Sequence, residues 1–523
     1  MRFIPKALLK KTYNRGSLRN QAGGVRLAVK NRLAPATLQR IDRIAIDGQP
    51  MDPAAVRVSV DGGEPFALER LSEDSPIDFA LGTLLTLMLD RPALEGGDHE
   101  IALEFTAEPF GTLAFMVRDA LNTGEQAADA IPRSTEDDYA TDVIQARRRF
   151  VRDHTDSSLE HVAKESFDPY VCRGNIEHFI GAAQIPLGVA GPLHVQGQHA
   201  DGAHYVPLAT TEGTLVASYN RGMKVIAGSG GVKCTVIGDN MQRAPVFEFE
   251  DAATARRFAD WLVARMDEIR AVCTESDRFV TLKHIDYYLV SRFVFTRFNY
   301  TTGDAAGMNM VGKATFAACN WILQQAAEFE VRNFFLESNF ATDKKASQIN
   351  SMRTRGKRVV AECTVKRDVL RDVMDADTEM LAHHARVANI GSMLAGANNN
   401  GCHAANAITA IFIATGQDVA NVAESSAGIL YTELTPERDL YISITLPSLI
   451  VATIGGGTGL PTQNECLRMM GCAGPGKVLK LAEIIAGTVL AGEISLAAAI
   501  SSLDWVSSHD QYGRNDPTRE SGE

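Results

Sequence analysis

Four short stretches in the first 125 residues alternate apolar and polar side chains, and this pattern constrains the fold more than any other feature of the sequence. Turn signals such as Asp47-Gly48 and Asp61-Gly62-Gly63 separate them. Alternation with a period of two, interrupted by such turns, predicts antiparallel strands with one buried face. We therefore predict a small β-sandwich over residues 1–125, an accessory module without a cluster of catalytic residue types. The four stretches are 25–30, 56–60, 100–105 and 112–117.

The chain is too long for a single hydrophobic core, since 523 residues predict two or three domains. Residues 126–165 are polar and predict a linker, in which the run Arg147-Arg148-Arg149 indicates a helix with a solvated basic face. The sequence beyond it is richer in glycine and alanine and predicts mixed α/β and α+β structure. A polar tail occupies residues 516–523.

Residues 245–337 form a compact unit of their own, inserted into a large, mostly helical domain made of residues 166–244 and 338–515. Strand, helix, strand, strand, helix, strand is the predicted order, which is that of the ferredoxin-like fold. The predicted elements are, in this order, 247–249, 252–272, 279–283, 287–298, 310–327 and 331–336.

Composition argues against several classes of partner. A net charge of −12 at pH 7 disfavours nucleic acid and anionic membranes. The longest apolar stretches, 407–415 and 494–500, fall short of the ~20 residues that a membrane helix needs. The eight cysteines are dispersed, without CxxC pairs or histidines at zinc spacing. We expect reduced thiols, no metal, no membrane and no nucleic acid, and a cytoplasmic protein.

Glu212 is an isolated carboxylate among threonines and glycine, ahead of an apolar run. A carboxyl group removed from water resists ionisation, so its pKa rises and it can carry a proton at neutral pH, as a proton donor must. The alternative is a helix N-terminus with Thr210 or Thr211 as the cap. This segment alone leaves both interpretations open.

Two further segments suit charged ligands. Gly307 permits close backbone approach at the start of a predicted helix, whose N-terminus attracts phosphate. Lys344 and Lys345 can polarise a carbonyl and hold a carboxylate. A capped helix start and an exposed charged turn are the respective alternatives.

Asp418 closes an apolar helix that starts near His403, where the helix dipole disfavours an anion. A neighbouring lysine such as Lys344 would offset this cost. His509 is either a mobile acid that titrates near neutral pH or an ordinary surface residue. The glycine-rich segments 228–231 and 455–459 supply turns where backbone amides can meet a ligand.

Taken together and in this order, these segments resemble the hydroxymethylglutaryl-coenzyme A (HMG-CoA) reductase family. The resemblance covers about residues 165–515, leaves residues 1–125 outside, and is closest to the class I branch, which is mostly NADPH-dependent. The matching motifs are Ile185-Pro-Leu-Gly-Val-Ala-Gly-Pro-Leu193, Thr210-Thr-Glu-Gly213, Asn220-Arg-Gly222, Gly303-Asp304 with Gly307-Met-Asn-Met310, Thr342-Asp-Lys-Lys345, His403-Ala-Ala-Asn406, Gly416-Gln-Asp418, Gly455-Gly-Gly-Thr458 and Ser508-His509.

The resemblance implies a cytoplasmic enzyme of the mevalonate pathway of isoprenoid biosynthesis. It would reduce HMG-CoA by four electrons with two NADPH, giving mevalonate and free coenzyme A. Residues 166–244 and 338–515 would bind the CoA substrate, and residues 245–337 the cofactor. A homodimer or homotetramer with active sites at subunit interfaces is also implied.

The resemblance implies roles for four residues. Lys344 would stabilise the oxyanion that forms when hydride reaches the thioester carbonyl, and Glu212 would donate a proton to the mevaldehyde oxygen. Asp418 would lie between them in a coupled set. His509 would protonate the departing CoA thiolate from a mobile flap.

The other implied contacts fall into a substrate group and a cofactor group. The substrate group contains Arg221 for CoA, Arg243 and Lys345 for the carboxylate, and Ser218, Asn220 and Asn406. The cofactor group contains Arg278, Asp304, Gly307, Met308, Asn309 and Arg514.

Several positions depart from the family pattern, among them Gly312 for a serine and His178 for an asparagine. Asp277 stands beside Arg278 where a serine is expected, and an acid there repels a 2′-phosphate, which leaves NADH open beside NADPH. Glu337 replaces a family serine, and Arg386 is only a shifted candidate for a family lysine. Because the last two concern the substrate, a related acyl-CoA or aldehyde reductase with a different acyl group is the alternative function.

Overall fold

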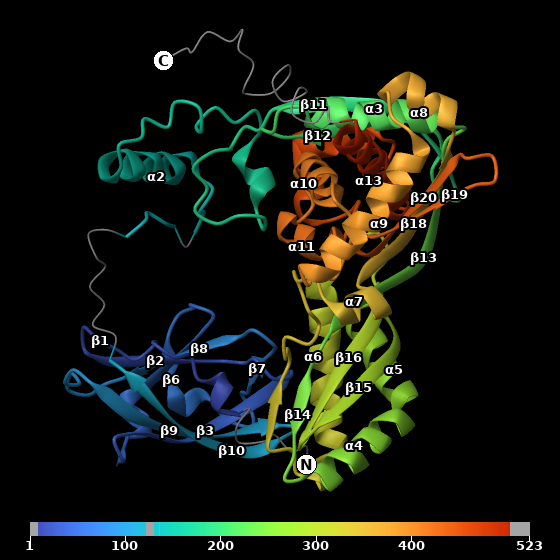
Figure 1. Cartoon of the computed structure of the whole chain (residues 1–523). Coiled ribbons are helices and arrows are strands. Elements are labelled where there is room, and N and C mark those ends of the chain that lie inside the picture. Colours follow the sequence, from blue (N-terminus) through green and yellow to red (C-terminus); the bar gives the residue numbers. More distant parts are fainter. Residues whose placement is uncertain (1–8, 122–129, 135, 503–523) are drawn as a thin grey trace.

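The computed structural model describes residues 9–121, 130–134 and 136–502. Figure 1 shows a β-sandwich in blue, a ferredoxin-like unit beside it, a large unit above that, and an arm around α2 (Thr141–His154). His509, Arg514 and the tail 516–523 lie outside the described residues.

Two antiparallel sheets form the N-terminal unit, in the orders β1-β2-β8-β5-β6 and β10-β9-β3-β4, with β7 paired to β3. Every second residue of β9 is buried, and inward side chains such as Leu87 and Phe105 of the two sheets share one core. All four predicted strands are present. The strands are β1 (Arg19–Gln21), β2 (Gly24–Lys30), β3 (Ala36–Ile46), β4 (Gln49–Pro50), β5 (Val56–Val60), β6 (Phe66–Ala67), β7 (Ile77–Phe79), β8 (Leu84–Leu89), β9 (Asp98–Glu108) and β10 (Gly111–Ala120).

The arm contains α2 and the short helix η4 (Pro169–Cys172). The prediction that the basic run of α2 faces solvent is wrong for two of its arginines, because Arg147 and Arg148 are buried. Arg147 pairs with Asp138, and Arg148 Nη2 lies 2.6 Å from Glu165 Oε1. Both carboxylates lie outside the helix, so the basic run alone could not indicate this burial.

The ferredoxin-like unit has a four-stranded antiparallel sheet in the order β17-β14-β16-β15. Three predicted boundaries are wrong. The break predicted between residues 283 and 287 is absent, because β15 runs from Thr281 to Val290. The helix predicted over 252–272 is broken at Arg265 into two, and the strand predicted over 287–298 contains a turn at Ser291, whose φ is +55°. The residues on either side of that turn are apolar, and the turn contains no glycine or proline, so the sequence carries no turn signal at this place. The elements are β14 (Val246–Glu248), α4 (Ala252–Ala264), α5 (Met266–Ser276), β15 (Thr281–Val290), β16 (Phe293–Thr301), α6 (Met308–Gln325) and β17 (Asn333–Phe335).

The large unit packs around α13 (Val478–Ser501), which contacts α3, α10 and β18. By length and composition α13 is apolar enough to cross a membrane, but 78% of its apolar window is buried inside the fold, as in the core helix of a globular domain. The uninterrupted apolar stretches in the sequence are shorter than this helix, because Glu483 and Glu493 lie within it.

Strand β13 (Val232–Arg243) belongs to both units. Residues 233–240 pair with β18 of the large unit, and residues 241–243 pair with β16 of the ferredoxin-like unit. The sheet of the large unit runs β12-β11-β13-β18-β20-β19. Its other elements are β11 (Leu187–Gly197), β12 (Asp201–Ala209), α3 (Leu215–Gly228), α7 (Gln348–Arg353), β18 (Gly356–Val365), α8 (Arg367–Met374), α9 (Thr378–Leu394), α10 (Ala404–Thr415), η6 (Val419–Asn421), α11 (Val422–Ser425), β19 (Ile429–Leu434), β20 (Leu440–Leu449) and α12 (Pro461–Met469).

Candidate active site

Helix α10 separates two groups of predicted site residues. Asn406 lies in its first turn, and Asp418 lies three residues beyond its last residue, Thr415. Because a helix rises about 1.5 Å per residue, roughly 14 Å of helix stands between the two groups. We refer to these places as the N-terminal end and the C-terminal end of α10.

The C-terminal end of α10 brings Lys344 and Asp418 together. Lys344 Nζ lies 3.0 Å from Asp418 Oδ2, and the two side chains are 41% and 39% exposed. The predicted proximity of Lys344 to Asp418 is confirmed, and Asp418 also accepts the backbone N–H of Ala420 at 3.1 Å as the N-cap of η6 (Val419–Asn421). The helix ends at Gly416 with φ +70°, where a Cβ would lie 2.2 Å from the backbone oxygen of Gly457. Two glycine motifs therefore contact each other here.

The N-terminal end of α10 carries Glu212 in a setting that differs from the prediction. Glu212 is exposed, and its carboxylate accepts a hydrogen bond from Asn406 Nδ2 at 3.2 Å. The helix-cap alternative is also wrong, since α3 begins at Leu215 and its N-cap, Thr214, makes no side-chain cap bond. Instead, Thr210 Oγ1 accepts the backbone N–H of Glu212 at 3.0 Å.

Two buried groups support the N-terminal end. Glu493 of α13 accepts the backbone N–H groups of Cys402, His403 and Ala404 at 2.8–3.0 Å, which caps α10. Burial raises the pKa of Glu493, and these hydrogen bonds oppose that shift. The His403 ring stacks on Tyr219 with centroids 4.7 Å apart. Burial lowers the pKa of His403 to about 4, so its ring is neutral at pH 7.

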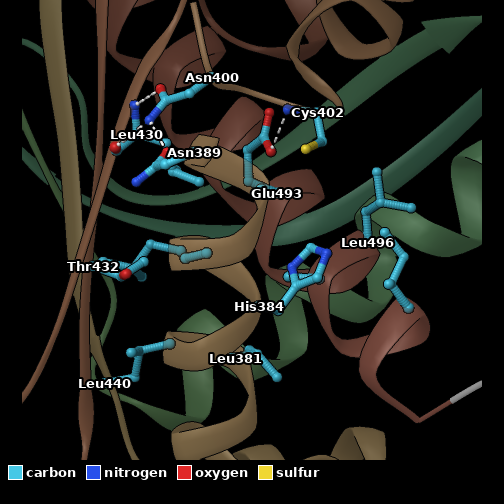
Figure 2. A pocket seen from close by; sticks show the side chains of 15 residues that line it. Leu381, His384, Asn389, Asn400, Cys402, Leu430, Thr432, Leu440, Glu493 and Leu496 are labelled. Atoms are coloured by element: carbon cyan, nitrogen blue, oxygen red, sulfur yellow. Dashed lines mark hydrogen bonds between the residues drawn. The ribbon is translucent and has the colours of Figure 1, made fainter. Parts of the chain in front are cut away.

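Two cavities lie in or beside the large unit, and none of the predicted site residues that the structure describes lines either of them. Figure 2 shows the smaller one, between α9, β19, β20 and α13, where Asn400 bonds to Asn389 and Leu430. Its volume of about 20 Å³ has room for a water molecule. The larger one, about 570 Å³, lies between the arm and the helices α10 and α12. The described site residues that the sequence predicts therefore lie outside both cavities.

The predicted substrate residues on α3 contact neighbouring elements of the large unit. Ser218 Oγ lies 3.0 Å from Ser495 Oγ of α13, and Arg221 Nη2 donates to the backbone oxygen of Ser495 at 3.1 Å. Asn220 Oδ1 accepts the N–H of Gly191 in β11 at 3.1 Å. Ser218 and Arg221 thus share one partner, whereas Asn220 supports a strand.

The two residues predicted to hold the substrate carboxylate have different surroundings. Lys345 is exposed, and its Nζ donates to the backbone oxygen of Asp343 at 3.2 Å. Arg243 Nη2 donates to the backbone oxygen of Met308 at 3.1 Å, and its Nη1 lies 3.6 Å from Glu337 Oε2. Glu337 therefore places a negative charge beside the arginine that a substrate carboxylate would approach.

The predicted cofactor residues surround the start of α6. Met308 and Asn309 are its first residues, and Gly307 before them has φ +79°. Among the described residues no side chain caps this helix, and an uncapped helix start can offer its first backbone N–H groups to an anion. Asp304 instead accepts the backbone N–H groups of residues 476–478 at 2.8–3.1 Å, which fixes the loop against the start of α13.

Arg278 lies apart from this loop in the sequence, between α5 and β15. Its guanidinium stands over the ring of Phe279, 4.7 Å from the centroid, and both side chains are exposed. A cation beside an exposed aromatic ring suits a nucleotide phosphate.

Two residues behind Lys344 have no signal in the sequence. Arg355 and Glu424 are fully buried and bonded to each other at 2.7 Å. Burial raises the pKa of Glu424 to about 7, and Arg355 opposes that shift. Neither belongs to a recognisable motif, and their partnership exists only in the folded chain.

Comparisons with known proteins agree on one family. A family model described as "Hydroxymethylglutaryl-coenzyme A reductase" matches residues 143–514. A second, "Hydroxymethylglutaryl-CoA reductase, N-terminal domain", matches residues 8–122. The expectation that residues 1–125 lie outside the family is therefore wrong.

Among relatives, the 3-hydroxy-3-methylglutaryl-coenzyme A reductase of Aeropyrum pernix is 44% identical over 382 residues, covering 72% of this chain and 90% of that protein. The enzyme of Methanothermobacter thermautotrophicus is 43% identical, covering 71% and 94%. A solved class II reductase from Streptococcus pneumoniae, bound to NADPH, shares the fold with a TM-score of 0.52 at 22% identity, over 63% of this chain and 89% of that chain.

Proposed function

The chain belongs to the hydroxymethylglutaryl-coenzyme A reductase family, and from this premise we propose how its residues convert HMG-CoA reductively to mevalonate. The thioester takes up two hydrides and two protons, and its C–S bond breaks to release coenzyme A. Lys344 and Asp418 at the C-terminal end of α10 carry the proposal, because a paired ammonium at 3.0 Å is a preorganised cation.

Lys344 stabilises the oxyanion that develops on the thioester carbonyl oxygen. Asp418 fixes the direction of the ammonium group through the ion pair at 3.0 Å. The same pair then meets the aldehyde oxygen of the second reduction. Substrate binding would exclude water from the half-exposed pair and strengthen its field.

Glu212 donates the proton to the mevaldehyde oxygen, and Asn406 orients its carboxyl group. Since about 14 Å of helix separates Glu212 from Asp418 within one chain, we propose that Glu212 acts opposite Lys344 of the partner subunit. A homodimer or a homotetramer with active sites at the subunit interface supplies this arrangement. His509 is proposed as the acid that protonates the CoA thiolate.

NADPH is the proposed cofactor, and it supplies the hydride. The uncapped start of α6 and the exposed Arg278 fit its phosphates. Asp304 contributes by holding the α6 loop in place. Arg514 completes the proposed contacts. Asp277 beside Arg278 keeps NADH open as the second nicotinamide donor.

CoA is proposed to contact Arg221 and Ser218, and the terminal carboxylate of the substrate is proposed to contact Arg243 and Lys345. Because Glu337 already faces Arg243 at 3.6 Å, the substrate carboxylate has to share or displace that pair. A cytoplasmic location is the proposed setting.

Initial rates with HMG-CoA, followed by nicotinamide absorbance with NADPH and NADH in parallel, test the proposal. Mevalonate and free CoA should form in equal amounts, with two nicotinamides oxidised per CoA and the higher kcat/KM with NADPH. A panel that includes 3-hydroxy-3-methylbutyryl-CoA, which lacks the terminal carboxylate, addresses the alternative acyl group. Faster reduction of that thioester than of HMG-CoA would contradict the proposed substrate contacts.

A further inference from the structure

Both ends of Lys344 are attached to one short segment, residues 418–425. Asp418, at its start, pairs with the ammonium group at 3.0 Å. Glu424, near its end, accepts the backbone N–H of Lys344 through Oε1 at 3.1 Å. The segment consists of η6 and α11, which are consecutive in the chain. The two carboxylates therefore hold the lysine from a single short piece of helical structure.

The backbone that Glu424 holds is in an uncommon conformation. Thr342 and Lys344 have φ values of +57° and +60°, a region that residues with a Cβ rarely adopt. Such conformations cost free energy and persist only where the surroundings enforce them. The hydrogen bond from Lys344 to Glu424 is one of the contacts that enforce this one.

Arg355 completes the support from below. Its Nη1 donates to the same Glu424 oxygen at 2.7 Å, and its Nη2 donates to Asp343 Oδ1 at 2.7 Å. Asn350 Nδ2 approaches the other Glu424 oxygen at 3.4 Å. Because a guanidinium is planar and its donors are fixed relative to one another, Arg355 sets the separation of the two carboxylates. The loop around Lys344 cannot move without breaking a bond to a buried charge.

We infer that Glu424 is a positioning residue for Lys344, holding its backbone while Asp418 holds its ammonium group. The inference rests on the catalytic role proposed for Lys344. Glu424 itself is buried beneath the loop.

The ionisation of Glu424 fits this role. Burial raises its pKa to about 7 against the opposing effect of Arg355, and the charged groups that face it are Arg355 and Asp343. Since the folded pKa lies above the unfolded value, this group favours folding only at low pH, and that contribution is lost as the pH rises through about 7. An ionised Glu424 therefore costs stability, as expected for a group kept for geometry.

The test compares two changes in the full-length enzyme with a matched control. Glu424→Gln keeps a carbonyl oxygen for both hydrogen bonds, whereas Glu424→Leu with Arg355→Met removes the bonds and leaves no unpaired buried charge. Glu483→Gln is the control, because Glu483 is another buried carboxylate that accepts three backbone N–H groups, at residues 198–200, far from Lys344 in the chain. Thermal unfolding verifies that each variant is folded.

The double variant should lose about 100-fold in kcat, as a misplaced catalytic group does, with KM for HMG-CoA within about 3-fold of the original. Glu424→Gln should retain kcat within about 10-fold, and the control should retain kcat. A folded double variant with unchanged kcat, or a KM that rises as much as kcat falls, overturns the inference.

The dependence of kcat on pH tests the inference even if the double variant does not fold. The original enzyme should lose kcat on acidification through about pH 7, and Glu424→Gln, which cannot ionise, should lose less. Identical profiles for the two overturn the inference. The two proposals can fail separately. If the original enzyme reduces HMG-CoA, Lys344→Ala does not, and the Glu424 variants keep the original kcat, the positioning role of Glu424 is refuted and the proposed function stands.

Discussion

The two ends of α10 are built by opposite means. At the N-terminal end, the buried carboxylate of Glu493 caps the first turn, beside the buried, neutral ring of His403. Glu212 is oriented there by the uncharged amide of Asn406. At the C-terminal end, ion pairs hold a loop with left-handed backbone around Lys344. The N-terminal end therefore contributes mainly to stability. The C-terminal end instead concentrates charged groups and strained backbone, the features on which the proposed chemistry depends.

Removing the ammonium at the C-terminal end should have the largest effect. Lys344→Ala should lower kcat for HMG-CoA reduction by about 1,000-fold or more, roughly 4 kcal/mol of transition-state stabilisation. Its unfolding midpoint should change little because the side chain is 41% exposed. Lys366→Ala, at another exposed lysine, is the control and should retain both activity and stability. Near-normal turnover in Lys344→Ala would contradict the role of the C-terminal end.

Removing the cap at the N-terminal end should affect stability first. Glu493→Ala leaves three backbone N–H groups without their partner, two of them buried, which should cost roughly 4 kcal/mol of unfolding free energy. Urea denaturation measures this as a lower midpoint at constant slope. Glu493→Gln, which keeps one acceptor oxygen, should cost less. Equal midpoints for the original enzyme and Glu493→Ala would remove the distinction between the two ends.

Acid should weaken the N-terminal end through His403. Its folded pKa of about 4 lies below the unfolded value near 6.5, so the unfolded chain binds the proton more readily. The stability from this group is present above about pH 6.5 and is lost as the pH falls toward 4, by up to about 3 kcal/mol. Urea midpoints between pH 7 and pH 4.5 should fall more steeply for the original enzyme than for His403→Phe, which still stacks on Tyr219. Parallel slopes would show that His403 is not a titrating group of this end.

The smallest effect is expected where Glu212 meets its amide partner. Asn406→Ala should lower kcat about 10-fold, equivalent to roughly 1.4 kcal/mol, since the carboxyl group remains but loses one orienting bond. Asn406→Gln, which can still donate, should recover part of that loss. Stopped-flow reduction of free mevaldehyde isolates the step in which Glu212 is proposed to act. A larger effect of Asn406→Ala on the thioester stage than on mevaldehyde would contradict the assigned step.

Sequence reasoning found the Lys344–Asp418 pair because the dipole of the preceding helix disfavours an anion at Asp418, which a nearby cation offsets. It also found the strands of the sandwich, where alternation is a property of each stretch alone. It did not find the exposure of Glu212 or the burial of Arg147. Those properties depend on which distant residues arrive beside them, and no local pattern contains that information.

The same limit explains why sequence reasoning missed the residues that support the loop around Lys344. Arg355 and Glu424 are 69 residues apart in the chain, and each looks like an ordinary surface charge in its own segment. Their partnership becomes visible only when the residues between α7 and β18 meet α11 in the folded chain.

Helix α13 forms the centre of the large unit, yet it follows every other described element of that unit in the chain. During synthesis, all strands of the sandwich and of the ferredoxin-like unit leave the ribosome before it, and these units can fold as they emerge. The apolar faces of α3, α10 and β18 stay uncovered until α13 has been made. Assembly of the catalytic unit is therefore a late event, and a nascent chain that stops before α13 carries two folded neighbours and no active enzyme.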